Sequence, residues 1–180
     1  PELDSRFISP ETGVELVTDK TLLVVVDTHK PSMVIEERLV SRTEKIVVID
    51  HHRRGEEFID NSILVYMEPY ASSTAELVTE LIEYQPKRVK VGMLESTALL
   101  AGIIVDTKSF TFRTGSRTFD AASLLRGHGA DTILVQKLLK ENVETYLKRA
   151  KLIEDVYFYQ EGIAIAHGDL NDFADQVLIA

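Results

Sequence analysis

The chain has 180 residues, enough for one α/β domain of ordinary size, or for one such domain and the beginning of another. Hydrophobic residues make up 44 % of the sequence, which excludes a disordered chain, and the absence of cysteine excludes disulfides and thiolate catalysis. The formal net charge of −9, from 20 basic and 29 acidic residues, makes a long nucleic acid an unexpected partner. Small phosphorylated ligands stay compatible with this charge, because a metal cluster can reverse the field locally.

The first apolar run that ends in candidate metal ligands lies at 22–26. It leads into Asp27, and His29 follows two residues later. The run is too short for a solo helix and is rich in β-branched residues, so it predicts a buried strand of a parallel sheet. Ahead of it, residues 14–17 alternate in polarity and predict an edge strand. Residues 33–40 carry apolar side chains at helical spacing and predict the crossover helix of a β-α-β unit.

A second stretch, 45–52, repeats the pattern: Lys45 is followed by an apolar run that leads into Asp-His-His at 50–52. Because ligands in open α/β sheets sit beyond the carboxyl ends of the strands, both runs deliver an acid and imidazole groups to one crevice. A third apolar run, 99–105, leads into Asp106 without a histidine. Three acids and several imidazoles at segment ends predict a metal-dependent hydrolase.

The remaining elements follow from hydrophobic periodicity and turn residues. Strands are expected at 62–66, 110–112 and 162–167, and helices at 75–84, 91–105, 119–125, 132–139, 143–159 and from 173 onward. A late strand and an opening helix cannot bury their own faces, so a second domain is expected to start near 160. We therefore expect an α/β fold with a parallel-sheet domain and flanking helices over 1–140, a linker helix over 141–160, and the start of a second α/β domain over 161–180.

The candidate metal ligands are the acids and imidazoles at these ends: Asp27, Asp50, His51, His52 and Asp106. Hard divalent ions such as Mn²⁺ or Mg²⁺ bind carboxylates and tolerate imidazole, and two ions held ~3.5–4 Å apart can activate water in a phosphoryl displacement. A single Asp at a strand end is equally well explained as a helix or turn cap. Asp-His-His directly after a buried strand is a stronger signal for a metal.

The other histidines carry weaker signals. His29 either lines the same cleft or lies in a solvated loop, and the sequence does not decide between these alternatives. His128 lies at a predicted helix end, where the helix dipole favours a cation, and we interpret it as structural. His167 is left unassigned.

Four further residues are candidates for binding phosphate. Ser72 and Ser73 precede a predicted helix, whose backbone N–H groups can receive an anion, although a plain helix cap explains both serines as well. Arg113 and Arg117 flank a glycine-containing loop and can clamp a phosphate, with exposed loop cations that lack a partner as the alternative. The sequence contains no Walker loop, dinucleotide-binding glycine motif or nucleophile elbow, so the functions that use them lack their usual signatures.

In this order along the chain, Asp27, the Asp-His-His at 50–52 and Asp106 resemble the DHH phosphoesterase superfamily. Its members include RecJ-type exonucleases, small-oligonucleotide phosphodiesterases and family II pyrophosphatases. Within the superfamily, the likeness to GdpP-type cyclic-di-AMP phosphodiesterases is closer and extends over nearly the whole chain, from residue 20 to residue 180. It is carried by three stretches, 68–77, 102–110 and 113–131.

This resemblance implies roles for individual residues. Asp27 would bridge two Mn²⁺ ions, with Mg²⁺ or Co²⁺ as alternatives, while His51 and Asp106 would complete the shell of the second ion. His52 would be the catalytic residue that stabilises the scissile phosphate. Residues 161–180 would begin the DHH-associated substrate-binding domain. The expected substrate is a cyclic dinucleotide or a short oligonucleotide.

The sequence departs from the family pattern in two places. The first motif of the family, His-x-Asp-x-Asp, supplies much of the first metal's shell and should precede Asp27, but residues 1–26 contain no histidine. The Gly-Gly-Gly-His motif of the associated domain is also missing from the sequence. We therefore expect an internal piece of a longer protein, which alone holds one metal weakly and hydrolyses little.

The resemblance implies that the parent protein hydrolyses cyclic-di-AMP to linear pApA with metal-activated water. An oligoribonuclease or a 3′-phosphoadenosine-5′-phosphate phosphatase would use the same metal residues and is the enzymatic alternative. The non-enzymatic alternative is a metal-binding or interaction module that folds, and forms a homodimer, without catalysis. GdpP-type proteins carry transmembrane helices before this region, so the parent is expected to be anchored in the membrane with this part in the cytoplasm. No apolar run here approaches the ~20 residues that cross a bilayer.

Overall fold

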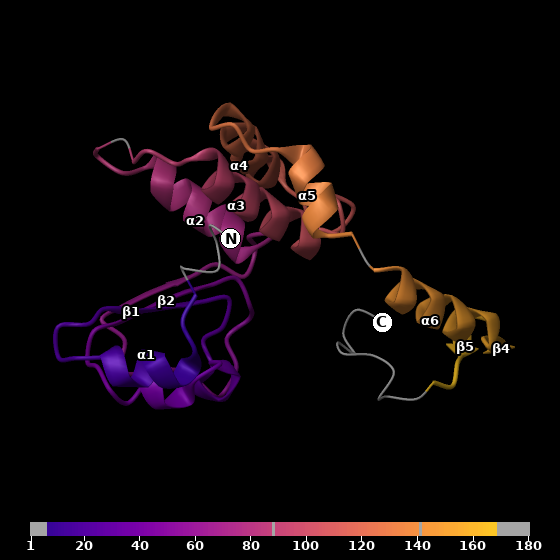
Figure 1. The fold of residues 1–180 in the computed structure, drawn as a ribbon, viewed down its shortest axis with the longest axis horizontal. Helices are drawn as coiled ribbons and strands as arrows, with labels where there is room; N and C mark the ends of the chain where they lie inside the picture. The colour runs from indigo at the N-terminus through magenta and orange to yellow at the C-terminus, as the bar shows by residue number, and fades with distance from the viewer. Residues whose placement is uncertain (1–6, 88, 141, 169–180) are drawn as a thin grey trace. The chain divides into compact units, whose positions relative to one another are not determined.

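The computed structural model describes residues 7–87, 89–140 and 142–168 of the chain. The chain divides into two compact units, residues 1–135 and residues 136–180. The first unit combines a small parallel sheet with a layer of helices, coloured from indigo towards orange in Figure 1. The acids and histidines of the predicted metal site belong to this unit, so its construction decides the geometry of the site.

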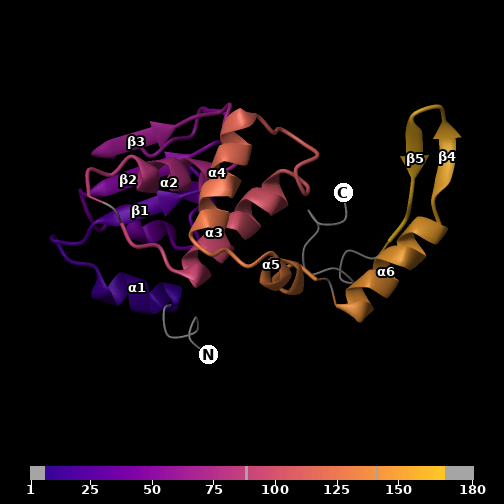
Figure 2. The same cartoon turned by 90° about the horizontal axis from the view of Figure 1, so that it is seen from above.

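The sheet has three parallel strands with β2 in the middle: β1 (Leu23–Val26), β2 (Ile46–Asp50) and β3 (Leu64–Met67). They lie side by side in Figure 2. The predicted strands of this region are confirmed, because β-branched residues favour the extended backbone of a sheet. The burial predicted for β1 is wrong for one of its faces, since Val24 and Val26 are 47 % and 52 % exposed. Val26, the last residue of β1, lies opposite Ile49, so β1 and β2 end within one residue of each other. The residues that follow the two strands therefore start from the same edge of the sheet.

The stretch predicted as an edge strand, 14–17, belongs mostly to a helix instead. This helix, α1 (Pro10–Leu16), has proline at its first position. The hydroxyl of Ser9 accepts a hydrogen bond from the backbone N–H of Thr12 and caps the helix. A capping serine followed by proline is a helix start, and these local signals outweigh a short alternation of polarity.

The crossover helix predicted at 33–40 is also wrong. Two short 3₁₀ turns, Pro31–Met33 and Glu37–Leu39, replace it. The expected apolar stripe is not buried as one face, because Val34 packs against the core of β1 and β2 whereas the Ile35 side chain is 94 % exposed. Without a continuous buried face, so short a segment gains too little from packing to form a regular α-helix.

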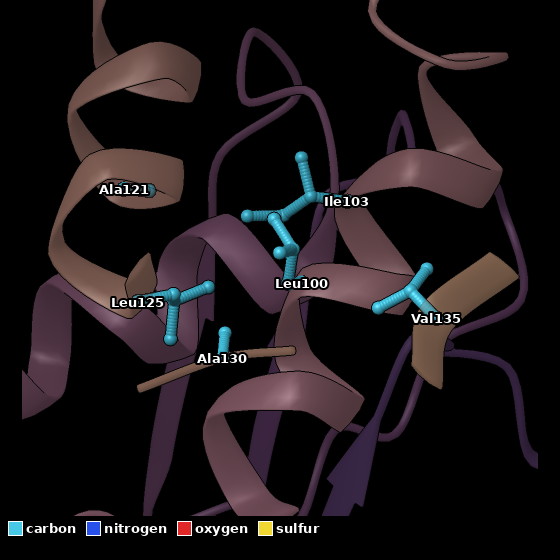
Figure 3. Close-up of a cluster of buried hydrophobic side chains, with 6 residues drawn as sticks. All are labelled: Leu100, Ile103, Ala121, Leu125, Ala130 and Val135. Carbon is cyan, nitrogen blue, oxygen red and sulfur yellow. The ribbon is translucent and has the colours of Figure 1, made fainter. Parts of the chain in front are cut away.

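Four helices follow in the chain: α2 (Thr74–Glu83), α3 (Met93–Asp106), α4 (Ser116–Gly127) and α5 (Thr132–Leu138), and the boundary between the two units falls within α5. The predicted helices are confirmed, with ends that differ by a few residues. Their shared core, shown in Figure 3, is a cluster of buried apolar side chains: Leu100, Ile103, Ala121, Leu125, Ala130 and Val135. In a separate cluster, Leu77 of α2 packs with Ile49 of β2, and this contact fixes the helices on the sheet.

The third acid of the predicted site comes from the end of a helix, because Asp106 is the last residue of α3. The chain then turns tightly, and Lys108, Ser109 and Phe110 have φ angles of 45°, 58° and 65°. Three successive residues with left-handed backbone cannot form a strand, so the strand predicted at 110–112 is wrong. The ring of Phe110 stacks instead on an aromatic ring of α4.

The second unit contains α6 (Val143–Glu154) and an antiparallel hairpin of β4 (Tyr157–Gln160) and β5 (Ile163–Ile165). The helix therefore ends before Tyr159, the end that was predicted for it. Adjacent aromatic residues in β4 favour a strand over a helix. Gly162, with a φ of 79°, supplies the left-handed turn that the hairpin needs.

The strand predicted at 162–167 is confirmed over the residues of β5. The helix predicted from 173 onward lies outside the described residues. The domain boundaries at 140 and 160, and the assignment of 161–180 to a substrate-binding domain, stay predictions.

The helices α2 and α3, which carry residues of the site, pack closely against each other. An added Cβ at Gly102 would lie 3.0 Å from the Cβ of Ala75, and these two helices supply Thr74 and Asp106 to the site. We expect Gly102→Val to lower the free energy of unfolding by about 1–3 kcal/mol, because the extra methyl groups force the helices apart. Urea unfolding followed by circular dichroism measures this loss.

The matched control is Gly127→Val at the end of α4, where nothing lies within 4 Å of an added Cβ. This change should alter the free energy of unfolding by no more than about 0.5 kcal/mol. Equal losses in the two variants would contradict the explanation by close packing.

Candidate metal centre

Acids and imidazoles gather at the edge where β1 and β2 end. Ligand atoms of Asp27, His51 and His52 all lie within 4.8 Å of one another. The Nε2 atom of His51 is 3.5 Å from Oδ1 of Asp27 and 3.8 Å from Oδ2 of Asp106. Two ligands that each bind one ion at about 2 Å can lie no more than about 4 Å apart, so His51 is placed to share an ion with either acid. The structure therefore brings together Asp27, His51, His52 and Asp106 of the predicted ligands. It does not bring in Asp50, which is fully buried and pairs with other histidine nitrogens.

Asp27 reaches the cluster from a left-handed backbone, with a φ of 66°. Apart from glycine, Asp and Asn are the residues that best tolerate this conformation. The backbone N–H of Asp27 still donates to the carbonyl of Ile49 at 3.0 Å, so the turn starts at the last rung of the sheet. Thr74, the first residue of α2, donates its hydroxyl to Oδ1 of Asp27 at 2.8 Å. Backbone strain of this kind is held at functional sites by surrounding contacts, and here Thr74 supplies one.

The two imidazoles of the Asp-His-His motif have one ring nitrogen fixed by the protein. Nδ1 of His51 donates to the backbone carbonyl of Ala71 at 3.4 Å, and Nδ1 of His52 donates to Oδ1 of Asp50 at 2.7 Å. Since both partners are acceptors, the hydrogen-bond network assigns a proton to each Nδ1. Nε2 of each ring is then the atom left to bind a metal or a substrate. Metal-binding histidines in proteins are usually oriented in this way.

A buried pair lies behind these rings. Asp50 is 0 % exposed and its Oδ2 is 2.5 Å from Nδ1 of His29, which is 2 % exposed. Nε2 of His29 accepts the backbone N–H of Gly55 at 3.2 Å, so this ring is neutral with its proton on Nδ1. Burial alone would raise the pKa of Asp50, but the hydrogen bonds from His29 and His52 outweigh it and hold that pKa below the usual value. The alternative of a solvated loop for His29 is therefore wrong.

The two acids of the cluster, Asp27 and Asp106, lie close enough to repel each other, as carboxylates that share a cation do. Burial, and then the negative charge of Asp27, raise the pKa of the Asp106 carboxyl above its usual value, against the opposing effect of His51 and His52. A cation between two carboxylates removes this repulsion. Two carboxylates and two imidazoles form a donor set that suits divalent ions which bind carboxylates and accept imidazole, such as Mn²⁺ or Co²⁺. The residues present fit a divalent metal site.

The two serines predicted to bind phosphate are buried, and their hydroxyls have partners within the protein. Ser73 is the N-cap of α2, and its side chain accepts the backbone N–H of Glu76 at 3.0 Å. Ser72 donates its hydroxyl to Oε2 of Glu76 at 2.6 Å. These contacts are those of a plain helix cap, which was the stated alternative. A phosphate-binding role for the serines stays a prediction.

The two candidate arginines lie in different settings. Arg117 belongs to α4 rather than to a loop, and it donates two hydrogen bonds of 2.8 Å to the carboxylate of Glu80 in α2. Those bonds, against the effect of burial, hold the pKa of Glu80 below its usual value. Arg113 lies in the loop before α4 with a φ of 51° and lines a pocket with Arg53 and Tyr70. Of the predicted pair, only Arg117 makes an ion pair among the described residues.

The ion pair of Arg117 and Glu80 should make stability depend on pH. A carboxyl whose pKa is lower in the folded state stabilises the fold above its unfolded pKa, here near 4.5, and this contribution is lost as the pH falls through the folded value. In a double-mutant cycle of Arg117→Gln and Glu80→Gln, we expect a coupling energy of about 1 kcal/mol at about pH 7 and almost none at about pH 3. Urea unfolding of the four proteins measures it. A coupling that persists in acid would contradict the assignment.

The buried pair generates a second expectation. His29→Ala leaves the Asp50 carboxylate without one of its partners, and we expect a loss of about 3–5 kcal/mol in the free energy of unfolding. His29→Asn keeps a donor near Asp50 and should lose less. In variants that still fold, Mn²⁺ affinity measured by calorimetry should fall by about 10–100-fold for His29→Ala, because Asp50 directly precedes the ligand His51 and loses a partner that holds it in place. Unchanged affinity in a folded His29→Ala protein would sink this role for the pair.

Comparison with known sequences gives relatives over almost the whole chain. It is 72 % identical over 179 residues to the cyclic-di-AMP phosphodiesterase GdpP of Geobacillus thermodenitrificans, and 70 % identical over 181 residues to the protein of that name from Bacillus subtilis. The cyclic-di-AMP phosphodiesterase PdeA of Listeria monocytogenes is 56 % identical over 180 residues. The alignments cover 99 %, 99 % and 100 % of this chain. The chain spans only 27 %, 28 % and 27 % of the respective relatives.

A solved structure supports the fold. An exopolyphosphatase-related protein from Bacteroides fragilis matches with a TM-score of 0.73 and 19 % sequence identity, over 86 % of this chain and 46 % of that one. The sequence profile of the DHH family, N-terminal domain, matches residues 3–103, which is more than half of the chain. This match and the convergence of Asp27 with the Asp-His-His motif lead to one conclusion: the chain belongs to the DHH family.

Proposed function

We propose that this chain is the DHH domain of a metal-dependent phosphodiesterase that hydrolyses cyclic-di-AMP to linear pApA. The observation that supports this most directly is the 72 % identity to a protein named cyclic-di-AMP phosphodiesterase, over 99 % of the chain. The cluster of Asp27, His51, His52 and Asp106 adds a chemical reason, because phosphodiester hydrolysis needs a nucleophilic water and a counter-charge for the phosphate. The substrate class proposed is a cyclic dinucleotide.

In this proposal Asp27, His51 and Asp106 would hold the metal. Mn²⁺ is the proposed metal, and Mg²⁺ and Co²⁺ are the alternatives. A bound divalent ion supplies an activated water and a Lewis acid for the phosphoryl oxygen. The protein's own part is positioning: Thr74 fixes one carboxylate oxygen of Asp27, and the carbonyl of Ala71 fixes the ring of His51.

His52 is the proposed catalytic residue. Its side chain is 53 % exposed, in contrast to the 7 % of His51, so it is open to a substrate as well as to the cluster. The bond from its Nδ1 to Asp50 fixes the ring and leaves Nε2 to contact a phosphoryl oxygen. To donate to a phosphoryl oxygen from Nε2, the His52 ring must carry a second proton, and the Asp50 carboxylate at Nδ1 favours this cationic form. A donor held in place in this way stabilises the charge that develops on phosphate in the transition state.

The setting of the domain in the parent protein is part of the proposal. Among the described residues, no helix is long and apolar enough to cross a membrane. We infer that the parent is anchored through other segments, with this part in the cytoplasm. A relative from Onion yellows phytoplasma, 39 % identical over 160 residues, has "membrane protein" in its name, which supports an anchor. A homodimer of the chain is also proposed, and sedimentation analysis tests it.

Calorimetric titration with Mn²⁺, followed by a hydrolysis assay with cyclic-di-AMP, tests the function. We expect the chain to bind Mn²⁺ weakly and to turn over little substrate. His51→Ala should weaken Mn²⁺ binding by more than about tenfold, because it removes the ligand that lies nearest to both acids. His128→Ala is the matched control, because His128 is an exposed residue at the end of α4. The His128→Ala variant should bind Mn²⁺ as the wild type does.

Two outcomes would contradict the proposal. If neither the wild type nor the His128→Ala variant binds Mn²⁺, Mg²⁺ or Co²⁺, the chain holds no metal site by itself. If the chain or its parent hydrolyses a short oligoribonucleotide or 3′-phosphoadenosine-5′-phosphate in preference to cyclic-di-AMP, the substrate is wrong although the metal chemistry stands.

A further inference from the structure

A pocket with a volume of about 560 Å³ lies in the first unit, and none of the residues that were first predicted as metal ligands lines it. Three loops form it: Arg53 comes from the loop after β2, Tyr70 and Ala71 from the loop after β3, and Arg113 from the loop before α4. Its volume is in the range of pockets that bind small molecules.

The pocket adjoins the metal cluster. The backbone carbonyl of Ala71, one of its lining residues, accepts the hydrogen bond from Nδ1 of His51. Arg53, another lining residue, directly follows His52 in the chain. A ligand in the pocket is therefore next to the proposed reacting centre, and the pocket can hold the part of the substrate that flanks the reacting phosphate.

The charge of the pocket is opposite to that of the chain. Two arginines line it and no acid does, although the formal net charge of the protein is −9. Across residues 7–87, 89–140 and 142–168, neither Arg53 nor Arg113 makes an ion pair, whereas Arg117 and Arg38 each bind a glutamate. The guanidinium of Arg113 lies 5.6 Å from the centre of the Phe112 ring, a contact that leaves its charge in place. Two unneutralised guanidinium groups on one pocket select a phosphate or a carboxylate.

The pocket is also lined by an aromatic ring that other side chains do not cover. The side chain of Tyr70 is 91 % exposed, although a tyrosine normally buries much of its ring. The backbone N–H of Tyr70 donates to the carboxylate of Glu68 at 3.1 Å, which holds its backbone in place. Nucleic-acid bases stack on exposed aromatic rings of this kind, and the arginines select the phosphate of the same ligand. A ligand that satisfies both features has a planar base and a phosphate.

We propose that this pocket binds one nucleoside 5′-phosphate unit of the substrate. Arg53 and Arg113 bind its phosphate oxygens, and its base stacks on Tyr70. The proposal rests on the proposed function, because it assigns the substrate class of the same site. It moves the phosphate-binding role away from Ser72, Ser73 and Arg117, whose polar groups have partners within the protein.

The test measures binding to the chain without any metal, by calorimetry and by NMR chemical-shift changes, so that it does not depend on turnover. The probes are 5′-AMP, adenosine and inorganic phosphate. The variants Arg53→Ala and Arg113→Ala should weaken 5′-AMP and phosphate binding by about tenfold each and leave adenosine binding unchanged. Tyr70→Ala should weaken 5′-AMP and adenosine binding by about tenfold, with phosphate binding unchanged. Tyr70→Phe should bind all three probes as the wild type does.

Arg54→Ala is the matched control. Arg54 is adjacent to Arg53 and has the same charge, but its guanidinium lies 4.1 Å from the centre of the Phe58 ring and does not line the pocket. This variant should bind 5′-AMP as the wild type does. Because the pocket residues changed are exposed, thermal unfolding should show that all variants are folded.

Three results would overturn the pocket: no binding of 5′-AMP, equal losses in Arg53→Ala and Arg54→Ala, or unchanged 5′-AMP binding in Tyr70→Ala. Failure of the proposed function gives a different result. If 5′-AMP binds as described but the parent protein does not hydrolyse cyclic-di-AMP with Mn²⁺, the function fails and the pocket stands. If the parent hydrolyses cyclic-di-AMP and Arg53→Ala leaves KM unchanged, the pocket fails and the function stands.

Discussion

A carboxylate with no solvent exposure, that of Asp50, lies at the end of the central strand, and the candidate site is built on it. It accepts one hydrogen bond from His29, which follows β1, and two from the next-but-one residue, His52. A buried charge that loses a partner is strongly destabilising, so the segments beyond both strands are held in one arrangement. The exposed ligands of the cluster have little packing of their own. Their positions depend on this buried group and on the hydroxyl of Thr74.

The surface around this group has two halves of opposite electrical character. On one side, the carboxylates of Asp27 and Asp106 repel each other and favour a cation. On the other side, Arg53 and Arg113 favour an anion. A phosphodiester is a ligand that uses both, because a divalent ion and a guanidinium can bind different oxygens of one phosphate or of neighbouring phosphates. An acidic chain can thus present an attractive site to an anionic substrate without a basic surface.

The sequence predicted the convergence of the ligands because it depends on a simple rule. Parallel strands that end within one residue of each other place the residues after them at one edge, and the apolar runs before Asp27 and before Asp50 marked those ends. It missed Thr74 and the pairing of His29 with Asp50, because the partners lie 47 and 21 residues apart and no local pattern encodes a contact over that distance.

The errors in secondary structure have a similar origin. Periodicity predicted an amphipathic helix at 33–40, but whether its stripe is buried depends on neighbours that come later in the chain. Alternation predicted a strand at 110–112, whereas the preceding turn of left-handed residues is fixed by how the end of α3 meets α4. The glycine-containing stretch before Arg117 predicted a loop, but Gly115 is the N-cap of a helix, so Arg117 lies in the first turn of α4.

The left-handed backbone of Asp27 limits which residues can occupy this position. A side chain there must supply a carboxylate of the right length and must also accept a φ of 66°. Asn and Gly accept this backbone conformation but carry no charge. Glu carries the charge on a side chain that is one methylene too long, and β-branched residues meet neither requirement. A library of variants selected only for folding would therefore retain Asp, Asn and Gly at position 27. A library selected for metal binding would retain Asp alone.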